Sequence, residues 1–149
     1  MRRPGVFGFG WLTLRVQVAV LCVAPGDATI QTMTRTVLIV DDHPGFRTSA
    51  RRTLEADGYQ VVGEAQDGRS GIAAARALRP DIVLLDVNLP DLDGFEVASA
   101  LTGADDAPIV VLTSSLDLGD VNWLVARSGA RGFVAKADLS GAALEALLR

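Results

Sequence analysis

The chain has 149 residues, which is enough for one ordinary domain with its own hydrophobic core. Hydrophobic residues make up 49% and charged residues 21%, and this composition excludes an intrinsically disordered chain. One cysteine and one histidine exclude a disulfide framework, a cysteine-based zinc site and a histidine-rich metal centre. The net charge of −4 argues against a nucleic-acid-binding domain, which normally carries a basic face.

Residues 1–33 differ from the rest of the chain and are predicted to be an N-terminal extension. Arg15 in the middle of the apolar stretch makes it a poor membrane span, because a buried arginine is costly in a bilayer. Arg2 and Arg3 before an apolar run fit a signal peptide, whereas the alternation at residues 12–18 fits a strand. We favour an extension that is poorly ordered or results from a misassigned start, because Met33 directly precedes the first regular strand.

From residue 34 onward, strand-like and helix-like segments alternate five times. Apolar runs rich in Val, Ile and Leu predict strands at residues 36–40, 60–64, 81–85, 108–112 and 132–135. Start and stop signals predict helices at residues 44–57, 67–78, 93 onward, 117–128 and 139–148. Among these signals are Pro44 at a first helical position, a capping box from Asp93 to Glu96, and Asp138 as the cap of the last helix.

This alternation predicts an α/β fold. Continuous apolar strands separated by helices indicate a parallel sheet that is buried on both faces. Right-handed crossover connections require helices on both sides, so the fold is doubly wound. The strand at residues 60–64 is only partly apolar and is therefore expected at or near an edge of the sheet.

Polar residues stand at the carboxyl ends of four predicted strands: Asp41 and Asp42, then Asp86, Thr113 and Lys136. Ligands of open parallel sheets bind outside these ends, and three carboxylates would meet there if the strand order is 2-1-3-4-5. Their mutual repulsion calls for a divalent cation or an ammonium group. Mg²⁺ suits a few carboxylates together with water and phosphate oxygens, and Lys136 can supply further positive charge. A carboxylate between these charges is placed to attack phosphorus.

Four motifs together resemble the receiver domain of bacterial two-component response regulators. They are DD at residues 41–42, DVNLPDLDG at 86–94, LTS at 112–114 and FVAK at 133–136. The resemblance covers about residues 35–149 and implies a flavodoxin-like, five-stranded parallel sheet with the order 2-1-3-4-5. VDDHP at 40–44 and GARGF at 129–133 look most like the branch of receivers that usually precedes a helix-turn-helix output domain.

The resemblance implies a phosphoacceptor and a magnesium site. Asp86 matches the phosphoacceptor of the family. Asp42, Asp86 and the backbone carbonyl of Asn88 match its direct Mg²⁺ ligands, and Asp41 would act through a metal-bound water. A purely capping role for Asp41 and Asp42 at the start of the helix at residue 44 is the structural alternative.

The resemblance also implies a switch. Thr113 and Lys136 match the residues that contact the phosphoryl group, and Phe133 matches the aromatic residue that packs inward when the threonine moves. Asn88 and Ser115 match positions that influence the dephosphorylation rate. The structural alternative for Thr113 is an ordinary hydroxyl at a strand end. The structural alternative for Phe133 is plain packing in the core.

The resemblance predicts a stand-alone, cytoplasmic response regulator receiver of residues 34–149, with no output domain after Arg149. It is a phosphoacceptor signalling protein rather than an enzyme, and its phosphodonor is a sensor histidine kinase or a histidine phosphotransfer protein. His43 is interpreted as a turn residue before Pro44, because the kinase partner supplies the histidine in this family.

A downstream protein is expected to bind the face formed by residues 117–128, 132–135 and 139–148. Trp123 is expected there either as a partly exposed anchor or as an ordinary half-buried residue. Direct nucleic-acid and membrane contacts are not expected, and a homodimer on activation stays open. The alternatives are a phosphorylation-independent pseudo-receiver and an Asp-nucleophile phosphatase. The phosphatase is disfavoured because His43, not an acid, stands two residues after Asp41.

Overall fold

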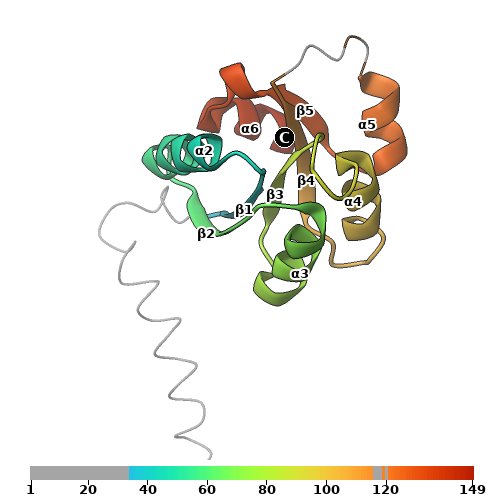
Figure 1. Ribbon diagram of the computed structural model, residues 1–149. Helices are drawn as coiled ribbons and strands as arrows, with labels where there is room; N and C mark the ends of the chain where they lie inside the picture. Colours follow the sequence, from blue (N-terminus) through green and yellow to red (C-terminus); the bar gives the residue numbers. More distant parts are fainter. Residues whose placement is uncertain (1–33, 116–118, 120) are drawn as a thin grey trace, which may run out of the picture. The chain divides into compact units, whose positions relative to one another are not determined.

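The computed structural model describes residues 34–115, 119 and 121–149, and its centre is a five-stranded parallel sheet (Figure 1). The strands lie in the order β2-β1-β3-β4-β5, which confirms the predicted flavodoxin-like order and the edge position of β2. Their bounds are β1 (Thr36–Val40), β2 (Gln60–Ala65), β3 (Ile82–Asp86), β4 (Ile109–Ser114) and β5 (Gly132–Ala135). The predicted extension at residues 1–33 lies outside the described residues.

Helices cover both faces of the sheet, as the alternation of elements predicts. Their bounds are α2 (Pro44–Ala56), α3 (Gly68–Leu78), α4 (Gly94–Leu101), α5 (Asn122–Ser128), α6 (Gly141–Leu148) and the 3₁₀ turn η2 (Lys136–Asp138). In Figure 1, α2 and α6 lie on one side of the sheet, and α3 and α4 lie on the other. None of the helices within the described ranges has the length and hydropathy that a membrane span requires.

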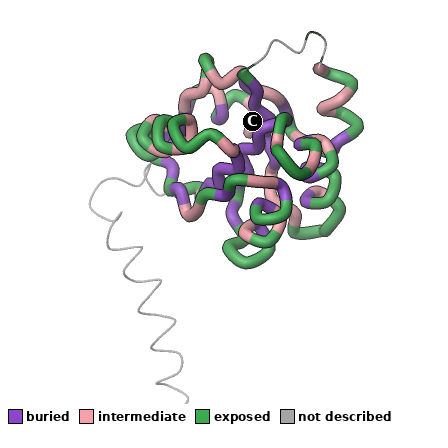
Figure 2. The backbone as a smooth tube through the Cα atoms, viewed as in Figure 1, coloured by how far each residue is buried: buried purple, intermediate pink, exposed green. Residues whose placement is uncertain are grey.

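Alternate side chains of β1 pack into two separate hydrophobic cores, one on each face of the sheet. Val37 and Ile39 pack in the core beneath α2 and α6, whereas Leu38 and Val40 pack in the core beneath α3 and α4. All four are completely buried, and Figure 2 shows that the buried segments gather along the strands. Burial on both faces explains why the strands are continuous apolar runs.

Local capping differs from the prediction at two helices. Asp93 does cap α4, but its side chain accepts a hydrogen bond from Phe95 N rather than forming the predicted box with Glu96. The last helix begins at Gly141, and Ser140 is its cap in place of Asp138. The reason lies elsewhere in the fold: Asp57 at the end of α2 accepts from Gly141 N at 2.7 Å and so selects the first residue of α6.

The helix after β4 is shorter than predicted. It begins at Asn122 rather than near Asp117, which lies outside the described residues. It ends at Ser128, and Gly129 follows with φ of +82°, a left-handed conformation that glycine adopts without strain. The Thr102 hydroxyl lies where a side chain at residue 129 would project, so this turn also packs closely on the end of α4.

Candidate functional site

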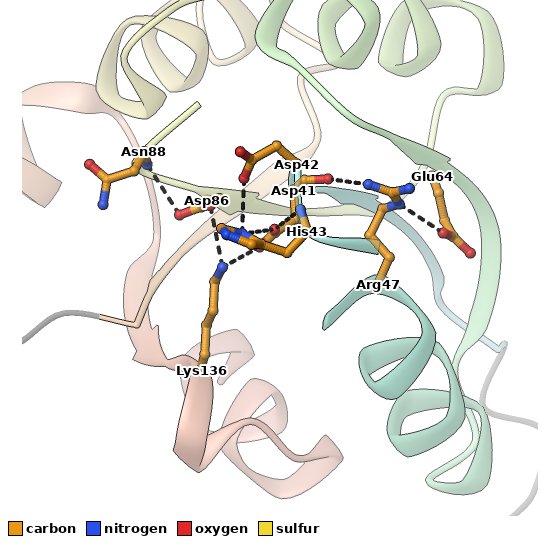
Figure 3. Close-up of polar contacts among 8 residues, drawn as sticks. All are labelled: Asp41, Asp42, His43, Arg47, Glu64, Asp86, Asn88 and Lys136. Atoms are coloured by element: carbon orange, nitrogen blue, oxygen red, sulfur yellow. Dashed lines mark hydrogen bonds and ion pairs between the residues drawn. The ribbon is translucent and has the colours of Figure 1, made fainter. Parts of the chain in front are cut away.

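Parallel pairing brings the predicted acidic residues to one edge of the sheet. Val40 pairs with Leu85, so Asp41 follows β1 beside the end of β3, where Asp86 is the last residue. Asp41 is completely buried, Asp86 is 2% exposed and Asp42 is half-buried. The structure therefore unites the three carboxylates that the strand pattern predicts at this position (Figure 3).

Lys136 supplies the positive charge of the site. It begins η2 directly after β5, and its Nζ lies 2.5 Å from Asp41 Oδ2 and 3.3 Å from Asp86 Oδ2. The same ammonium lies 4.6 Å from the centre of the Phe46 ring on α2, in a cation–π contact. The Lys136 ammonium thus bridges the buried carboxylates of Asp41 and Asp86, and it does not pair with Asp42.

The surroundings of the Asp86 carboxyl group raise its pKa. Burial raises the pKa of Asp86, and repulsion from Asp41 raises it further. The hydrogen bond from Asn88 N at 3.1 Å and the charge of Lys136 oppose this rise, but the pKa stays above its ordinary value. Three carboxylates gather at this edge and one ammonium, that of Lys136, pairs with two of them, so the acidic group has more negative charge than Lys136 balances.

The acidic group is compact enough to hold a metal ion. Ligand atoms of Asp41, Asp42, His43 and Asp86 all lie within 4.8 Å of one another. Three carboxylates are hard oxygen donors, and such donors suit Mg²⁺, which retains several waters and binds phosphate oxygens. The excess negative charge and the chemistry of these donors fit that ion. Asn88 lies two residues after Asp86 and is exposed to solvent.

Thr113 lies beside Asp86 because the two residues are register partners across β3 and β4. Its side chain is 1% exposed, and its hydroxyl has no hydrogen-bond partner among the residues that the structure describes. Buried hydroxyls are normally hydrogen-bonded, so an unpaired one next to a candidate phosphoacceptor is a group available to a ligand.

Three further residues that the sequence analysis names lie after β4, on β5 and on α5. Ser115 follows β4 and is exposed. Phe133 is half-buried and packs against the core beneath α3 and α4, which is compatible with its structural alternative. Trp123 on α5 is 55% exposed, and the Arg127 guanidinium lies 5.9 Å from its ring.

The sequence did not predict several contacts at the site. His43 precedes α2 as expected for a turn residue, but its Nδ1 also lies 3.0 Å from Asp42 Oδ1 and 3.2 Å from Asp41 Oδ1. Arg47, one turn further along α2, donates to the backbone carbonyl of Asp41 at 2.6 Å. Its Nε also pairs with Glu64 on β2 at 3.1 Å, so the helix, the acidic end of β1 and the edge strand are tied together.

Gly94 explains the end of the DVNLPDLDG motif. A side chain there would place its Cβ 2.5 Å from the carbonyl oxygen of Asp86 and 2.5 Å from Val87 Cα. Gly94 N donates to the Val87 carbonyl at 3.0 Å, which closes the loop between β3 and α4. Only glycine allows the first turn of α4 to approach the backbone of the candidate phosphoacceptor this closely.

Comparisons with known proteins agree with this geometry. The family model of the response regulator receiver domain matches residues 37–148. The transcription regulator BvgA of Bordetella pertussis is 41% identical over 104 residues, which are 67% of this chain and 48% of BvgA. The chain therefore spans about half the length of this relative.

Solved structures show the same fold. The signal receiver domain of NarL from Mycobacterium tuberculosis superposes with a TM-score of 0.69 and 32% identity, over 77% of this chain and 97% of that one. A chain of the CheX–CheY–BeF₃–Mg²⁺ complex from Borrelia burgdorferi superposes with a TM-score of 0.67 and 25% identity, over 76% and 86% respectively. The chain belongs to the response regulator receiver domain family, a signalling domain of two-component systems.

Proposed function

We propose that the chain accepts a phosphoryl group on Asp86 in a Mg²⁺-dependent reaction and thereby switches the binding of a protein partner. The phosphodonor is a sensor histidine kinase or a histidine phosphotransfer protein. The observation that carries the proposal is the buried Asp86 carboxylate, with Lys136 at 3.3 Å and the Asp41 and Asp42 carboxylates beside it.

The transfer itself is a substitution at phosphorus. An Asp86 oxygen forms the new bond to phosphorus while the bond from phosphorus to the donor nitrogen breaks, and that nitrogen keeps the electron pair. Lys136 stabilises the charge on the transferred group, because its ammonium already contacts Asp86. Burial raises the pKa of Asp86, and the charge of Asp41 adds to the rise, so positive charge beside Asp86 favours its ionised form.

The residues present fit the magnesium ion that the family binds. Asp42, Asp86 and the Asn88 backbone carbonyl would hold it, and Asp41 would act through a water. When bound, the ion supplies positive charge for the phosphoryl oxygens. Asn88 lies two residues after Asp86, and Ser115 lies two residues after Thr113, the register partner of Asp86. We assign both to control of the dephosphorylation rate.

The proposed switch begins at the Thr113 hydroxyl, for which the described residues offer no hydrogen-bond partner. A phosphoryl group on Asp86 offers that hydroxyl an acceptor, and movement of Thr113 makes room for Phe133 to pack inward. These contacts shift the population between two states of the face formed by α5, β5 and α6. Trp123 on this face is proposed as the anchor of a downstream partner, and Trp123→Ala is expected to weaken that binding without changing phosphorylation. Equal binding by this variant contradicts the anchor role.

The proposal is tested by incubating the full chain with acetyl phosphate and Mg²⁺ and measuring its intact mass. One added phosphoryl group is expected, and it should disappear with EDTA or in Asp86→Ala. Asp106→Ala is the matched control, because Asp106 is an exposed carboxylate remote from the motif residues. Absence of both added mass and a beryllofluoride-induced change would favour a pseudo-receiver, and continuous turnover of a phosphate ester would favour the phosphatase alternative.

A further inference from the structure

The loop at residues 87–93 connects β3 to α4 and borders the proposed metal site. Its base is closed by the hydrogen bond from Gly94 N to the Val87 carbonyl and by an antiparallel bridge between Asn88 and Asp93. These contacts fix the two ends of the loop relative to each other. They do not fix its tip relative to the rest of the domain.

The tip is attached to the start of α3 by Asp91. Asp91 Oδ1 accepts a hydrogen bond from Gly68 N at 2.7 Å, and Oδ2 accepts one from Arg69 N at 3.0 Å. These N–H groups belong to the first turn of α3 and have no acceptor within the helix. The next one, Ser70 N, is capped at 2.8 Å by Asp67. The amino end of α3 is therefore completed by two carboxylates, one local and one from the loop.

Apolar packing accompanies this polar contact. A Cβ on Gly68 would lie 2.9 Å from Leu92 Cβ and 3.0 Å from Val97 Cγ2, so the loop and the start of α4 press directly on the helix start. Leu92 is itself half-buried against the core beneath α3 and α4. The loop tip thus has one charged and one apolar attachment to α3.

We infer that Asp91 is a positioning residue for the metal site: by fastening the loop tip to the amino end of α3, it holds Asn88 in place beside Asp86. This inference rests on the proposed function, in which the Asn88 carbonyl is a metal ligand. Asp91 acts through the loop, because both of its carboxylate oxygens are engaged by backbone N–H groups. Without Asp91, metal binding must also order the loop, and the affinity falls.

The experiment measures the dissociation constant for Mg²⁺ by calorimetric titration of the full chain and several variants. Asp91→Ala is expected to raise the constant about 10-fold, the lower end of the effect of residues that orient metal ligands. Asp91→Asn keeps an oxygen that can accept one of the two hydrogen bonds, so it should recover part of the affinity. Unfolding in urea is measured on the same samples.

Two control variants separate the alternatives. Asp67→Ala removes the other cap of α3 without releasing the loop, and Glu96→Gln removes a carboxylate that lines the same groove as Asp91. Both are expected to change the Mg²⁺ constant less than about twofold. The inference is overturned if Asp91→Ala binds like the wild type, if Asp67→Ala loses as much affinity, or if Glu96→Gln and Asp91→Asn lose as much as Asp91→Ala. A wild-type chain that binds no Mg²⁺ contradicts the proposed function as well.

Discussion

Lys136 Nζ contacts Asp41 Oδ2 at 2.5 Å even though β3 and β4 lie between their strands in the sheet. The contact is possible because both residues follow the carboxyl ends of parallel strands, and because a lysine side chain is long. Lys136 is also the single lysine among 14 basic residues, and a compact ammonium can approach two carboxylates from one point. This ion pair underlies the first prediction.

Replacing Lys136 by alanine should destabilise the metal-free chain. The substitution leaves Asp41 and Asp86 buried without their cation, and removal of one partner of a buried ion pair costs about 3 kcal/mol. The free energy of unfolding from urea titration measures the loss. Arg52→Ala, at an exposed position on α2, serves as the control and should change it little. Equal stability of the Lys136→Ala variant and the wild type would show that the ion pair is not stabilising.

Replacing Thr113 by valine should stabilise the unphosphorylated chain by about 1 kcal/mol, because the buried hydroxyl lacks a hydrogen-bond partner in the described structure. Valine has nearly the same shape and no polar atom. Thr113→Ser is the matched control, since it keeps the hydroxyl and removes the methyl group, and it should be less stable than the wild type. The thermal midpoints of the three proteins provide the measurement, and a less stable valine variant would imply a hydrogen bond to this hydroxyl.

Replacing Gly94 by alanine should destabilise the chain by about 2 kcal/mol, the typical cost of forcing an extra methyl group into a packed region. The new Cβ meets backbone atoms of Asp86 and Val87, which cannot rotate away as a side chain could. Urea denaturation measures the effect. Gly45→Ala, where nothing lies within 4 Å of the added Cβ, is the control and should be tolerated. If both variants are equally stable, the loop must be able to yield at Gly94.

The ion pairs of Glu64 predict a defined pH dependence of stability. The hydrogen bond from Arg51 lowers the pKa of Glu64, burial opposes this, and the hydrogen bond from Arg47 lowers the pKa further. Because the folded-state pKa is below the unfolded value, the stabilisation is complete above the unfolded pKa of roughly 4.3 and is lost as pH falls through the folded pKa.

Glu64→Gln should therefore lower the free energy of unfolding at pH 7 by less than about 1 kcal/mol, since these groups are partly exposed and screened by solvent. The difference from the wild type should shrink as the pH drops below about 4.3. Unfolding curves at several pH values test this dependence. A difference that stays constant down to the lowest pH would mean that the charge of Glu64 is not the source of the effect.

Mg²⁺ should raise the unfolding temperature of the chain, and EDTA should reverse the rise. A ligand at 100 times its dissociation constant stabilises the folded state by about 2.7 kcal/mol if it does not bind the unfolded state. Asp42→Asn should abolish most of this response, because Asp42 belongs to the compact acidic group. Thermal denaturation over a series of Mg²⁺ concentrations measures the shift, and an unaltered response in Asp42→Asn would exclude that residue as a ligand.

Much of the fold could be predicted from the chain alone because its signals are local. Apolar runs mark all five strands to within a residue or two, and a proline marks the start of α2. Local signals failed at helix starts where several residues compete. Asp138 and Ser140 are both adequate caps, and Asp57 from the distant end of α2 decides between them.

Apolar periodicity along the chain is enough to predict the alternation of strands and helices, and with it the position of Asp41, Asp42, Asp86 and Lys136 at strand ends. Periodicity and strand direction suffice for that, because all carboxyl ends of a parallel sheet share one edge. The side chains that support this edge become apparent only once the chain is folded. The pairing of Arg47 with Glu64 and the attachment of Asp91 to the start of α3 join residues 17 and 22–23 positions apart. No local pattern encodes such contacts, since they depend on how the helices and loops pack against the sheet.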